Sequence, residues 1–243
     1  MKKYFDKPWG RLIFVSILFV IIRYLSKGLS RLAGSFIESN VVEDFSYESS
    51  IYKLFMVIFS LLSMSLTPGY SWKDFGFSKP KNVNYFKIFW LTFVIVLVGT
   101  IIFGSFYMGI LPKLLGDSEK AAGMEMTSGM SFVAVVLSIW IWSSISEEIY
   151  TRGLFQSLLD NLKKGKFLKL SLPVWLSGIV FGMLHLSVYS PGKLYFTLFI
   201  VTQTTILGVL AAYYREKSQS IYIAILIHIL GNVYGSLLSL IGS

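Results

Sequence analysis

Four ionisable side chains lie inside or at the end of long apolar segments of this chain: Glu147, Glu148, His185 and His228. Hydrocarbon solvates ions poorly, so acidic and imidazole groups in such segments are rarely there for packing alone. A carboxylate and an imidazole placed together can move protons and activate a water molecule. The sequence therefore predicts a reactive site inside a membrane.

The acidic pair follows directly on an apolar run. In a helix Glu148 and Arg152 are four residues apart and can form an ion pair, whereas Glu147 points about 100° away from Glu148. Glu147 would then be the carboxylate without a charge partner, and we expect it to act as the general base. The alternative interpretation is that both glutamates only mark the interfacial end of a membrane helix.

Each histidine has a notable neighbour four residues away, which places both members of the pair on one helix face. Phe181 precedes His185 in this way, and Asn232 follows His228. Histidine and asparagine can serve simply as hydrogen-bonding links between membrane helices. Because two histidines, an asparagine and two glutamates are spread over three apolar segments, we favour a shared site over separate links.

The composition indicates a polytopic membrane protein with an all-α fold. Of its 243 residues 54% are hydrophobic and 14% are charged, and the mean hydropathy is +0.66. We predict a helical bundle of seven to eight transmembrane helices in a single transmembrane domain, residues 1–243. The run at 194–214 could be one span or two shorter pieces. The candidate spans are 11–30, 51–67, 86–111, 130–150, 170–188, 194–214 and 219–241.

The charge pattern suits orientation in a membrane. The net charge is +9, but the basic residues form short clusters between apolar runs, so we expect no nucleic acid partner. The clusters before the first run and after the second, fourth and sixth runs predict a multi-pass protein of the cell membrane with a cytosolic N-terminus. Cysteine is absent, which excludes thiolate nucleophiles and disulfides.

Other proteolytic mechanisms lack their residues. A zinc protease of the H-E-x-x-H type needs glutamate directly after histidine, but Leu186 and Ile229 stand there. No aspartate lies in the interior of a predicted span, and no G-x-S-x-G motif is present. A mechanism that uses glutamate and histidine remains.

Three motifs occur in order: E-E-x-x-x-R from Glu147 to Arg152, F-x-x-x-H from Phe181 to His185, and H-x-x-x-N from His228 to Asn232. This order resembles the CPBP family of CAAX prenyl proteases and bacteriocin-processing enzymes, also called Abi proteins. The similarity covers about residues 132–232 and places the catalytic core at about 130–235. It implies an intramembrane endopeptidase.

The resemblance also implies a role for each matching residue. Glu147 and His185 would activate a water molecule that attacks the scissile carbonyl. His228 and Asn232 would stabilise the developing oxyanion, which needs hydrogen-bond donors directed at that oxygen. Under the simplest topology Glu147 lies near the cytosolic side and His185 lies deeper, so tilted or broken helices must bring them level.

Glu148 and Arg152 would shape the site. The residues leave open whether a metal takes part, because Glu147, His185 and His228 could also bind Zn²⁺ with an open position for water. The resemblance is compatible with a metallo-endopeptidase and with a metal-free mechanism of glutamate and histidine. We favour the metal-free mechanism.

The expected partners are the lipid bilayer and a peptide or lipidated protein substrate held at the membrane. The resemblance suggests CAAX-type processing, or bacteriocin maturation or self-immunity. The competing interpretation is a non-catalytic membrane immunity protein, or a transporter in which buried Glu and His relay protons. We find no internal symmetry of the kind that transporters often show.

Overall fold

The computed structural model describes residues 7–35, 45–116 and 131–241. These residues are predominantly helical, which confirms the predicted all-α class. The strands among them are short: β1 (Lys166–Phe167) and β2 (Leu170–Ser171) pair antiparallel in a small hairpin. Residues 1–6, whose lysines support the predicted cytosolic N-terminus, lie outside the described ranges.

Each predicted apolar run forms a helix, and the run at 194–214 is a single one. Two of the helices include π-helical stretches, which widen the turn by one residue. We call the helix from Phe132 to Gln156 the central helix. The elements are α2 (Pro8–Gly34); α4 (Phe45–Ser65); α5 (Tyr85–Gly99), which continues as η1 (Thr100–Ile110) and α6 (Leu111–Leu114); the central helix, made of α7 (Phe132–Ala134), η2 (Val135–Ser143), α8 (Ser144–Glu148) and η3 (Ile149–Gln156); η4 (Asp160–Leu162); α9 (Leu172–Leu184) with η5 (His185–Val188); α10 (Leu194–Ser218); and α11 (Ile221–Ile241).

Five of the described helices are long and apolar enough to cross a membrane: Pro8–Gly34, Tyr85–Leu114, the central helix, Leu194–Ser218 and Ile221–Leu238. Two further apolar helical stretches are shorter, with at most 17 residues each: Ser49–Ser65 within α4, and Leu172–Val188, which comprises α9 and η5. Such a helix is about 26 Å long, against about 30 Å for the hydrocarbon core of a bilayer. The fold is thus a multi-pass helical membrane bundle.

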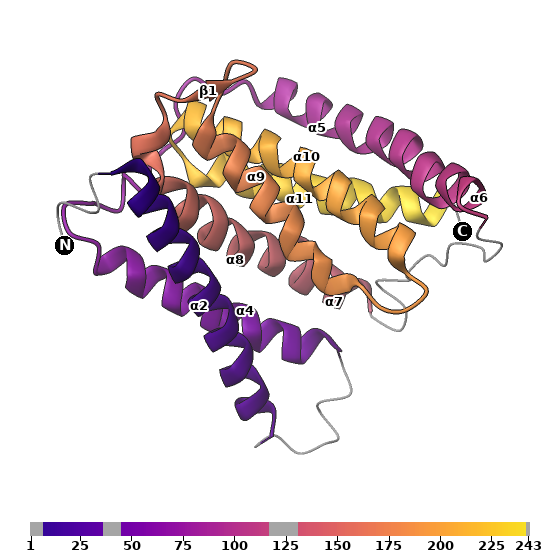
Figure 1. The fold of residues 1–243 in the computed structure, drawn as a ribbon, viewed down its shortest axis with the longest axis horizontal. Helices are drawn as coiled ribbons and strands as arrows, with labels where there is room; N and C mark the ends of the chain where they lie inside the picture. The colour runs from indigo at the N-terminus through magenta and orange to yellow at the C-terminus, as the bar shows by residue number, and fades with distance from the viewer. Residues whose placement is uncertain (1–6, 36–44, 117–130, 242–243) are drawn as a thin grey trace.

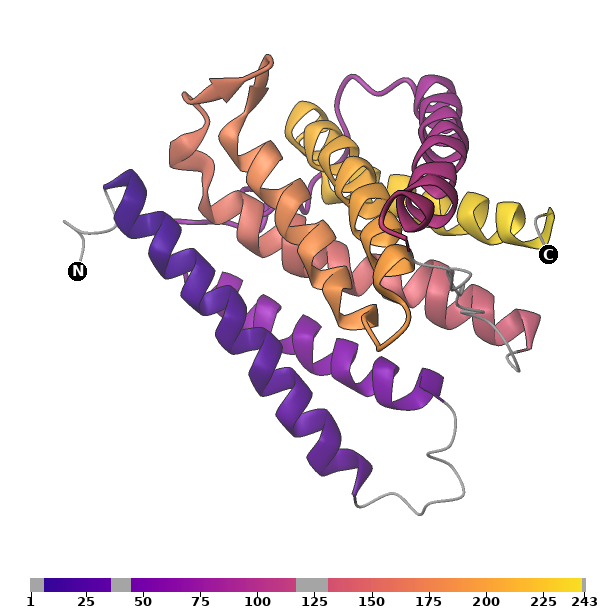
Figure 2. The ribbon, with the colours of Figure 1, turned by 45° about the vertical axis from the view of Figure 1, so that its right-hand side comes forward.

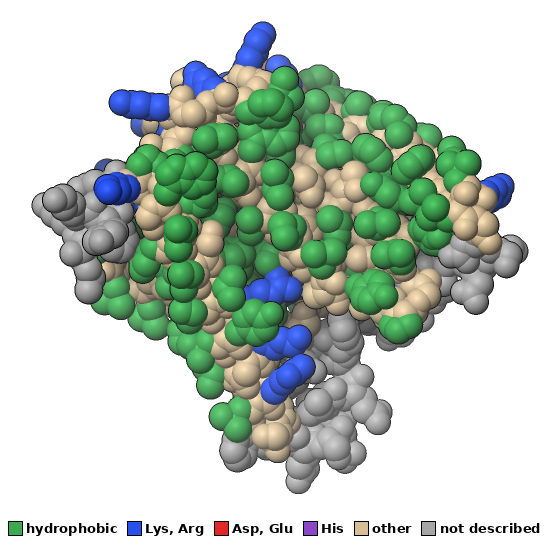
Figure 3. Space-filling model, viewed as in Figure 1, with side chains coloured by type: hydrophobic (Ala, Val, Ile, Leu, Met, Phe, Trp, Pro, Cys, Tyr) green, Lys and Arg blue, Asp and Glu red, His purple; other side chains and the backbone are tan. Residues whose placement is uncertain are grey.

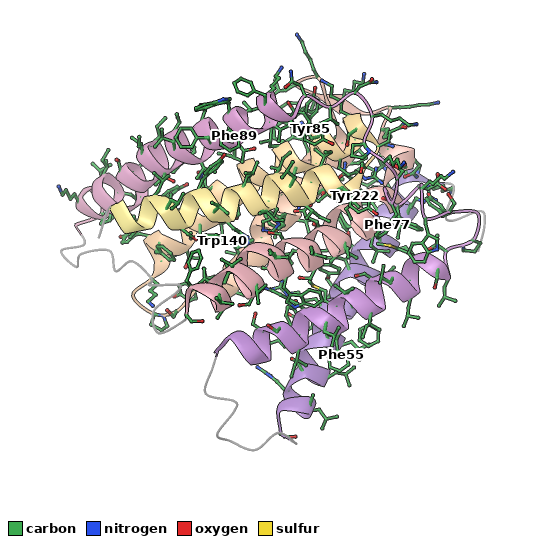
Figure 4. The ribbon with its side chains drawn as sticks, turned by 180° about the vertical axis from the view of Figure 1, so that it is seen from behind. Phe55, Phe77, Tyr85, Phe89, Trp140 and Tyr222 are labelled. Carbon is green, nitrogen blue, oxygen red and sulfur yellow. The ribbon has the colours of Figure 1, made fainter. Side chains whose placement is uncertain are left out.

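The central helix lies between the N-terminal helices and the C-terminal ones (Figures 1 and 2). On one side α4 packs against it, and α2 packs against α4; we call α2 and α4 together the N-terminal hairpin. On the other side α11 packs against it, with α5 over α11, while α9 and α10 lie side by side. Figure 4 shows Trp140 of the central helix beside α11, where its indole nitrogen donates to the Ser236 hydroxyl at 3.1 Å.

Small residues bring α9 and α10 into close contact. An added Cβ at Gly178 would lie 2.4 Å from a Val209 methyl carbon, and one at Gly182 would lie 1.8 Å from the Thr205 hydroxyl oxygen. Glycines four residues apart let two membrane helices approach at backbone distance. This contact fixes the face of α9 that carries Phe181, which is 1% exposed.

The surface is largely apolar, as a lipid-facing surface must be. Figure 3 shows hydrophobic side chains across most of the visible face, with Lys and Arg gathered mainly near the β1–β2 hairpin and in a row beside α2. The buried set, by contrast, includes Glu148, Arg152 and His228, which are 0%, 0% and 4% exposed. The polar interior lies between the central helix, α9 and α11.

Candidate active site

The two glutamates lie on α8, a single α-helical turn between the π-helical stretches η2 and η3. A π-helical turn shifts the direction of the side chains that follow it, and such turns are frequent at functional sites. Glu148 is fully buried, and the Glu147 side chain is 16% exposed. The carboxylates therefore point in different directions and meet different partners.

The predicted ion pair of Glu148 and Arg152 is confirmed, with Nη1 and Oε1 2.7 Å apart. The same guanidinium donates to the Gly208 carbonyl at 2.8 Å and lies 4.3 Å from the centre of the Phe181 ring. A Cβ at Gly208 would lie 3.0 Å from Nη2, so glycine at position 208 leaves room for this bond. Arg152 thus ties the central helix to α9 and α10.

His228 of α11 lies between the two carboxylates. Its Nδ1 is 3.0 Å from Glu148 Oε1, and its Nε2 is 4.0 Å from Glu147 Oε2. The first distance is a hydrogen bond, and the second is too long for one. Glu148 therefore orients the imidazole, and the free Nε2 faces Glu147.

His185 also packs against the Phe181 ring. The ring centre of Phe181 is 5.0 Å from that of His185 and 5.1 Å from that of His228. Nδ1 of His185 is 3.0 Å from the Phe181 carbonyl, so its Nε2 is left for other partners. The Glu147 carboxylate is close enough to interact electrostatically with both imidazoles.

The regular α-helix of α9 ends at Leu184, and η5 begins with His185. His185 therefore lies at the C-terminal end of α9. Both histidine rings lie against Phe181, and the Glu147 carboxylate lies 4.0 Å from His228 and interacts electrostatically with His185. Side chains from three separate helices therefore lie near one another, and their catalytic roles stay predictions.

Asn232 joins α11 to the central helix. Its amide nitrogen donates to the Ile139 carbonyl and to the Ser144 hydroxyl, both at 3.1 Å. Both amide hydrogens are thereby used, so an oxyanion would have to displace one of these acceptors. The oxyanion role of Asn232 stays a prediction.

Lys53 of α4 is a site residue that the sequence reasoning missed. Its Nζ lies 3.4 Å from Glu147 Oε1 and donates to the Ser143 hydroxyl at 2.6 Å, and Ser143 donates to the same Oε1 at 2.7 Å. The expectation that Glu147 has no charge partner is therefore wrong. A signal was present, because Lys53 is the one charged residue in the apolar run 51–67.

Across the described ranges no three His, Cys, Asp or Glu side chains are grouped so that they could hold a metal ion. Glu147 and His228 face each other, but Nδ1 of His228 is already bonded to Glu148. The donor set Glu147, His185 and His228 is thus close together without forming a ligand cluster. No step of the chemistry below is assigned to a metal.

Comparison with known proteins finds a family match for the part of the chain that carries the candidate site. No curated protein and no solved structure matches the chain. The family model described as type II CAAX prenyl endopeptidase Rce1-like matches residues 129–234, which include the central helix, α9, α10 and most of α11. The resemblance read from the three motifs is confirmed, since residues 129–234 are similar to this family of CAAX prenyl endopeptidases.

Proposed function

We propose that the protein is an intramembrane endopeptidase that hydrolyses a peptide bond of a membrane-associated or lipidated substrate. One observation carries the proposal: Glu147 Oε2 faces His228 Nε2 at 4.0 Å, and the rings of His228 and His185 both pack against Phe181. Two polar atoms at that separation can each contact one bridging water molecule. The family supports the reaction class, and the substrate and mechanism are our proposals.

Glu147 is the proposed general base. It takes a proton from the bridging water, whose oxygen adds to the scissile carbonyl carbon and gives a tetrahedral oxyanion. The proton then passes to the amine nitrogen as the carbon–nitrogen bond breaks, which releases two peptides. His185 contributes its free Nε2 to holding the water, because its Nδ1 is bonded to the Phe181 carbonyl.

His228 Nε2 contacts the water before the attack and is the proposed hydrogen-bond donor to the oxyanion after it. This second role sets a condition on the protonation of the ring. Its Nδ1 is bonded to Glu148. If Nδ1 carries the proton of that bond, Nε2 donates only when both ring nitrogens are protonated. Glu148, which is held by Arg152, therefore orients the ring and also supplies the negative charge beside a doubly protonated imidazole.

Lys53 and Ser143 are proposed to position the base. Both contact Oε1 of Glu147, whereas Oε2 is the oxygen that faces His228. A carboxylate held through one oxygen presents the other in a defined direction. The Glu147 carboxylate would thus already be oriented toward the water before the reaction.

The decisive experiment is cleavage by the purified protein in lipid nanodiscs, followed by mass spectrometry of the products. We would offer a prenylated CAAX peptide and, separately, a bacteriocin precursor peptide, because the family resemblance suggests both. We expect Glu147→Gln to lower cleavage at least about 100-fold. Glu216→Gln, at the end of α10 where Glu216 accepts from Ser171, is the matched control and should cleave normally.

Full cleavage by Glu147→Gln would remove the base assignment. No cleavage of either peptide by the wild-type protein would favour the non-catalytic alternative, an immunity protein or transporter. A chelator added to the active protein addresses Zn²⁺ at Glu147, His185 and His228: unchanged activity supports the metal-free route, and loss restored by Zn²⁺ supports the metal.

We also propose that Ser49–Ser65 and Leu172–Val188 cross the membrane, which with the five longer helices makes seven crossings and a cytosolic N-terminus. The chain lacks cysteine, so single cysteines can be labelled against an empty background. Cysteines at Lys7 and at Lys166 of β1 should both react with an impermeant maleimide from the cytosolic side. Labelling of the two from opposite sides would contradict seven crossings.

A further inference from the structure

Three basic residues of α2 lie along one face of that helix. Arg23, Lys27 and Arg31 are spaced four residues apart, which aligns them on successive turns. Figure 3 shows Lys and Arg side chains in a row beside the lower half of α2. Residues 8–34 lie outside the region that the family model matches, so this row is a property of the N-terminal hairpin.

The row begins next to the candidate active site. The Arg23 Nη2 donates to the Leu184 carbonyl at 3.2 Å, and Leu184 directly precedes His185. Tyr52 of α4 interacts electrostatically with both the Arg23 guanidinium and the Glu147 carboxylate. Arg23 therefore lies beside the same group of residues, between α2, α4 and the end of α9.

A helix-capping role accounts for only part of this arrangement. The Leu184 carbonyl lies at the end of α9, where a cation is favourable, and it already accepts a hydrogen bond from the Ser187 hydroxyl at 2.9 Å. A guanidinium has five N–H donors, however, and the bond from Arg23 to Leu184 uses one of them. Lys27, one turn further on, contributes nothing to the cap.

The depth of the row argues that these cations face something other than lipid. Arg23 lies eleven residues before the end of α2 at Gly34, which is about 17 Å along the helix axis. Arg23 is half-buried and Lys27 is exposed, and neither has an acidic partner within residues 7–35, 45–116 and 131–241. Cations at such depth require water or an anion beside them.

We propose that Arg23 and Lys27 form an anion-binding subsite, which binds a carboxylate of the peptide substrate next to the scissile bond. The planar guanidinium matches a carboxylate in two parallel hydrogen bonds, and Lys27 adds a second positive charge. This inference rests on the proposed function, because it assigns the substrate a place beside His185. It makes the substrate a peptide with a free C-terminus held close to the cleaved bond.

A lipid phosphate is the other anion that basic residues in membranes meet, and its position differs. A headgroup lies at the membrane surface, where Arg31 would reach it; Arg23 is eight residues further in, about 12 Å along the axis. A carboxylate at the site thus depends on Arg23 and Lys27, whereas a headgroup depends on Arg31.

The test measures binding, so it does not require turnover. Two fluorescent prenylated CAAX peptides, identical except for a C-terminal carboxylate or carboxamide, are titrated against Glu147→Gln protein in zwitterionic nanodiscs. We expect the carboxylate peptide to bind at least about tenfold more tightly. The ratio of the two dissociation constants, carboxamide over carboxylate, should fall close to one when Arg23→Gln is added. Lys27→Gln should lower this ratio in part, and Arg23→Lys should retain part of it.

Arg31→Gln is the matched control and should leave the ratio unchanged, also in nanodiscs that contain phosphatidylglycerol. Equal binding of the two peptides would overturn the subsite, and so would absence of binding. The same holds if Arg31→Gln or the anionic lipid removes the ratio, because the row would then hold lipid phosphate. If the wild type cleaves neither peptide while the ratio persists, the proposed function fails and the subsite stands.

Discussion

The N-terminal hairpin and the family-matched region place their charges in opposite ways. In the matched region Glu148, Arg152 and His228 are buried and bonded to one another. In the hairpin Arg23 and Lys53 are half-buried, carry charge of one sign and reach toward groups on other helices. In the matched region the buried charges neutralise one another, whereas the hairpin places further positive charge beside that group of residues.

The space around glycines also differs between the two regions. Gly178, Gly182 and Gly208 lie at contacts where an added methyl group would clash, whereas nothing lies within 4 Å of a Cβ added at Gly28 or Gly34 of α2. The matched region is therefore tightly determined by its close helix contacts. At Gly28 and Gly34, by contrast, the hairpin has room for a larger side chain.

The largest expected effect is on activity, from His228→Ala. Loss of the imidazole removes the group between the two carboxylates and the proposed oxyanion donor, so kcat/KM should fall by about 100- to 10,000-fold. The measurement is peptide cleavage in nanodiscs. Tyr222→Phe, on an exposed position of α11, serves as the control and should retain full activity. A fall below tenfold in His228→Ala would mean that the matched region does not house the chemistry.

The next effect is on stability, from Arg152→Met. It leaves the Glu148 carboxylate buried without its ion-pair partner, which should cost about 3–5 kcal/mol of unfolding free energy. Unfolding in mixed detergent micelles measures this cost. The double variant with Glu148→Gln should recover part of it, and Arg31→Met in the hairpin should cost less than about 1 kcal/mol. Equal costs at Arg152 and Arg31 would contradict the contrast between buried and exposed charge.

A pair of glycine substitutions compares the packing directly. Gly182→Ala should destabilise the protein by about 1–3 kcal/mol, because the new methyl group would meet the Thr205 hydroxyl and the Val201 carbonyl. Gly28→Ala has open space and improves helix propensity, so it should be neutral or stabilise by up to about 1 kcal/mol. The same micelle assay reports both. Equal losses would show that the two regions are packed alike.

The smallest effect is expected at Lys53, where the hairpin meets the matched region. Lys53→Met should lower kcat about tenfold, an effect of about 1.4 kcal/mol, with KM nearly unchanged, because the change disturbs the orientation of Glu147. Lys53→Arg keeps the charge and should retain most activity. Steady-state kinetics separates the two constants. A rise in KM alone would make Lys53 a substrate contact and not a positioning residue.

Local spacing explains what the sequence could predict. The ion pair of Glu148 and Arg152 follows from helix geometry alone, and the apolar runs predicted the helices. The motif order predicted that His185 and His228 would meet near Glu147. Lys53 was missed because its contact with Glu147 joins two helices far apart in the chain, and spacing within a helix carries no information about such a contact. The engagement of Asn232 with Ser144 was missed for the same reason.

The shortness of α9 with η5 has a consequence for the supply of water. If Leu172–Val188 crosses the membrane, as proposed above, a helix of this length draws the two leaflets together around it, a response known as hydrophobic mismatch. We then expect aqueous solvent to reach the end that carries His185 more easily than it reaches the middle of the longer helices. Hydrolysis consumes a water molecule in every turnover, and a thinned membrane at this helix shortens the route by which it is replaced.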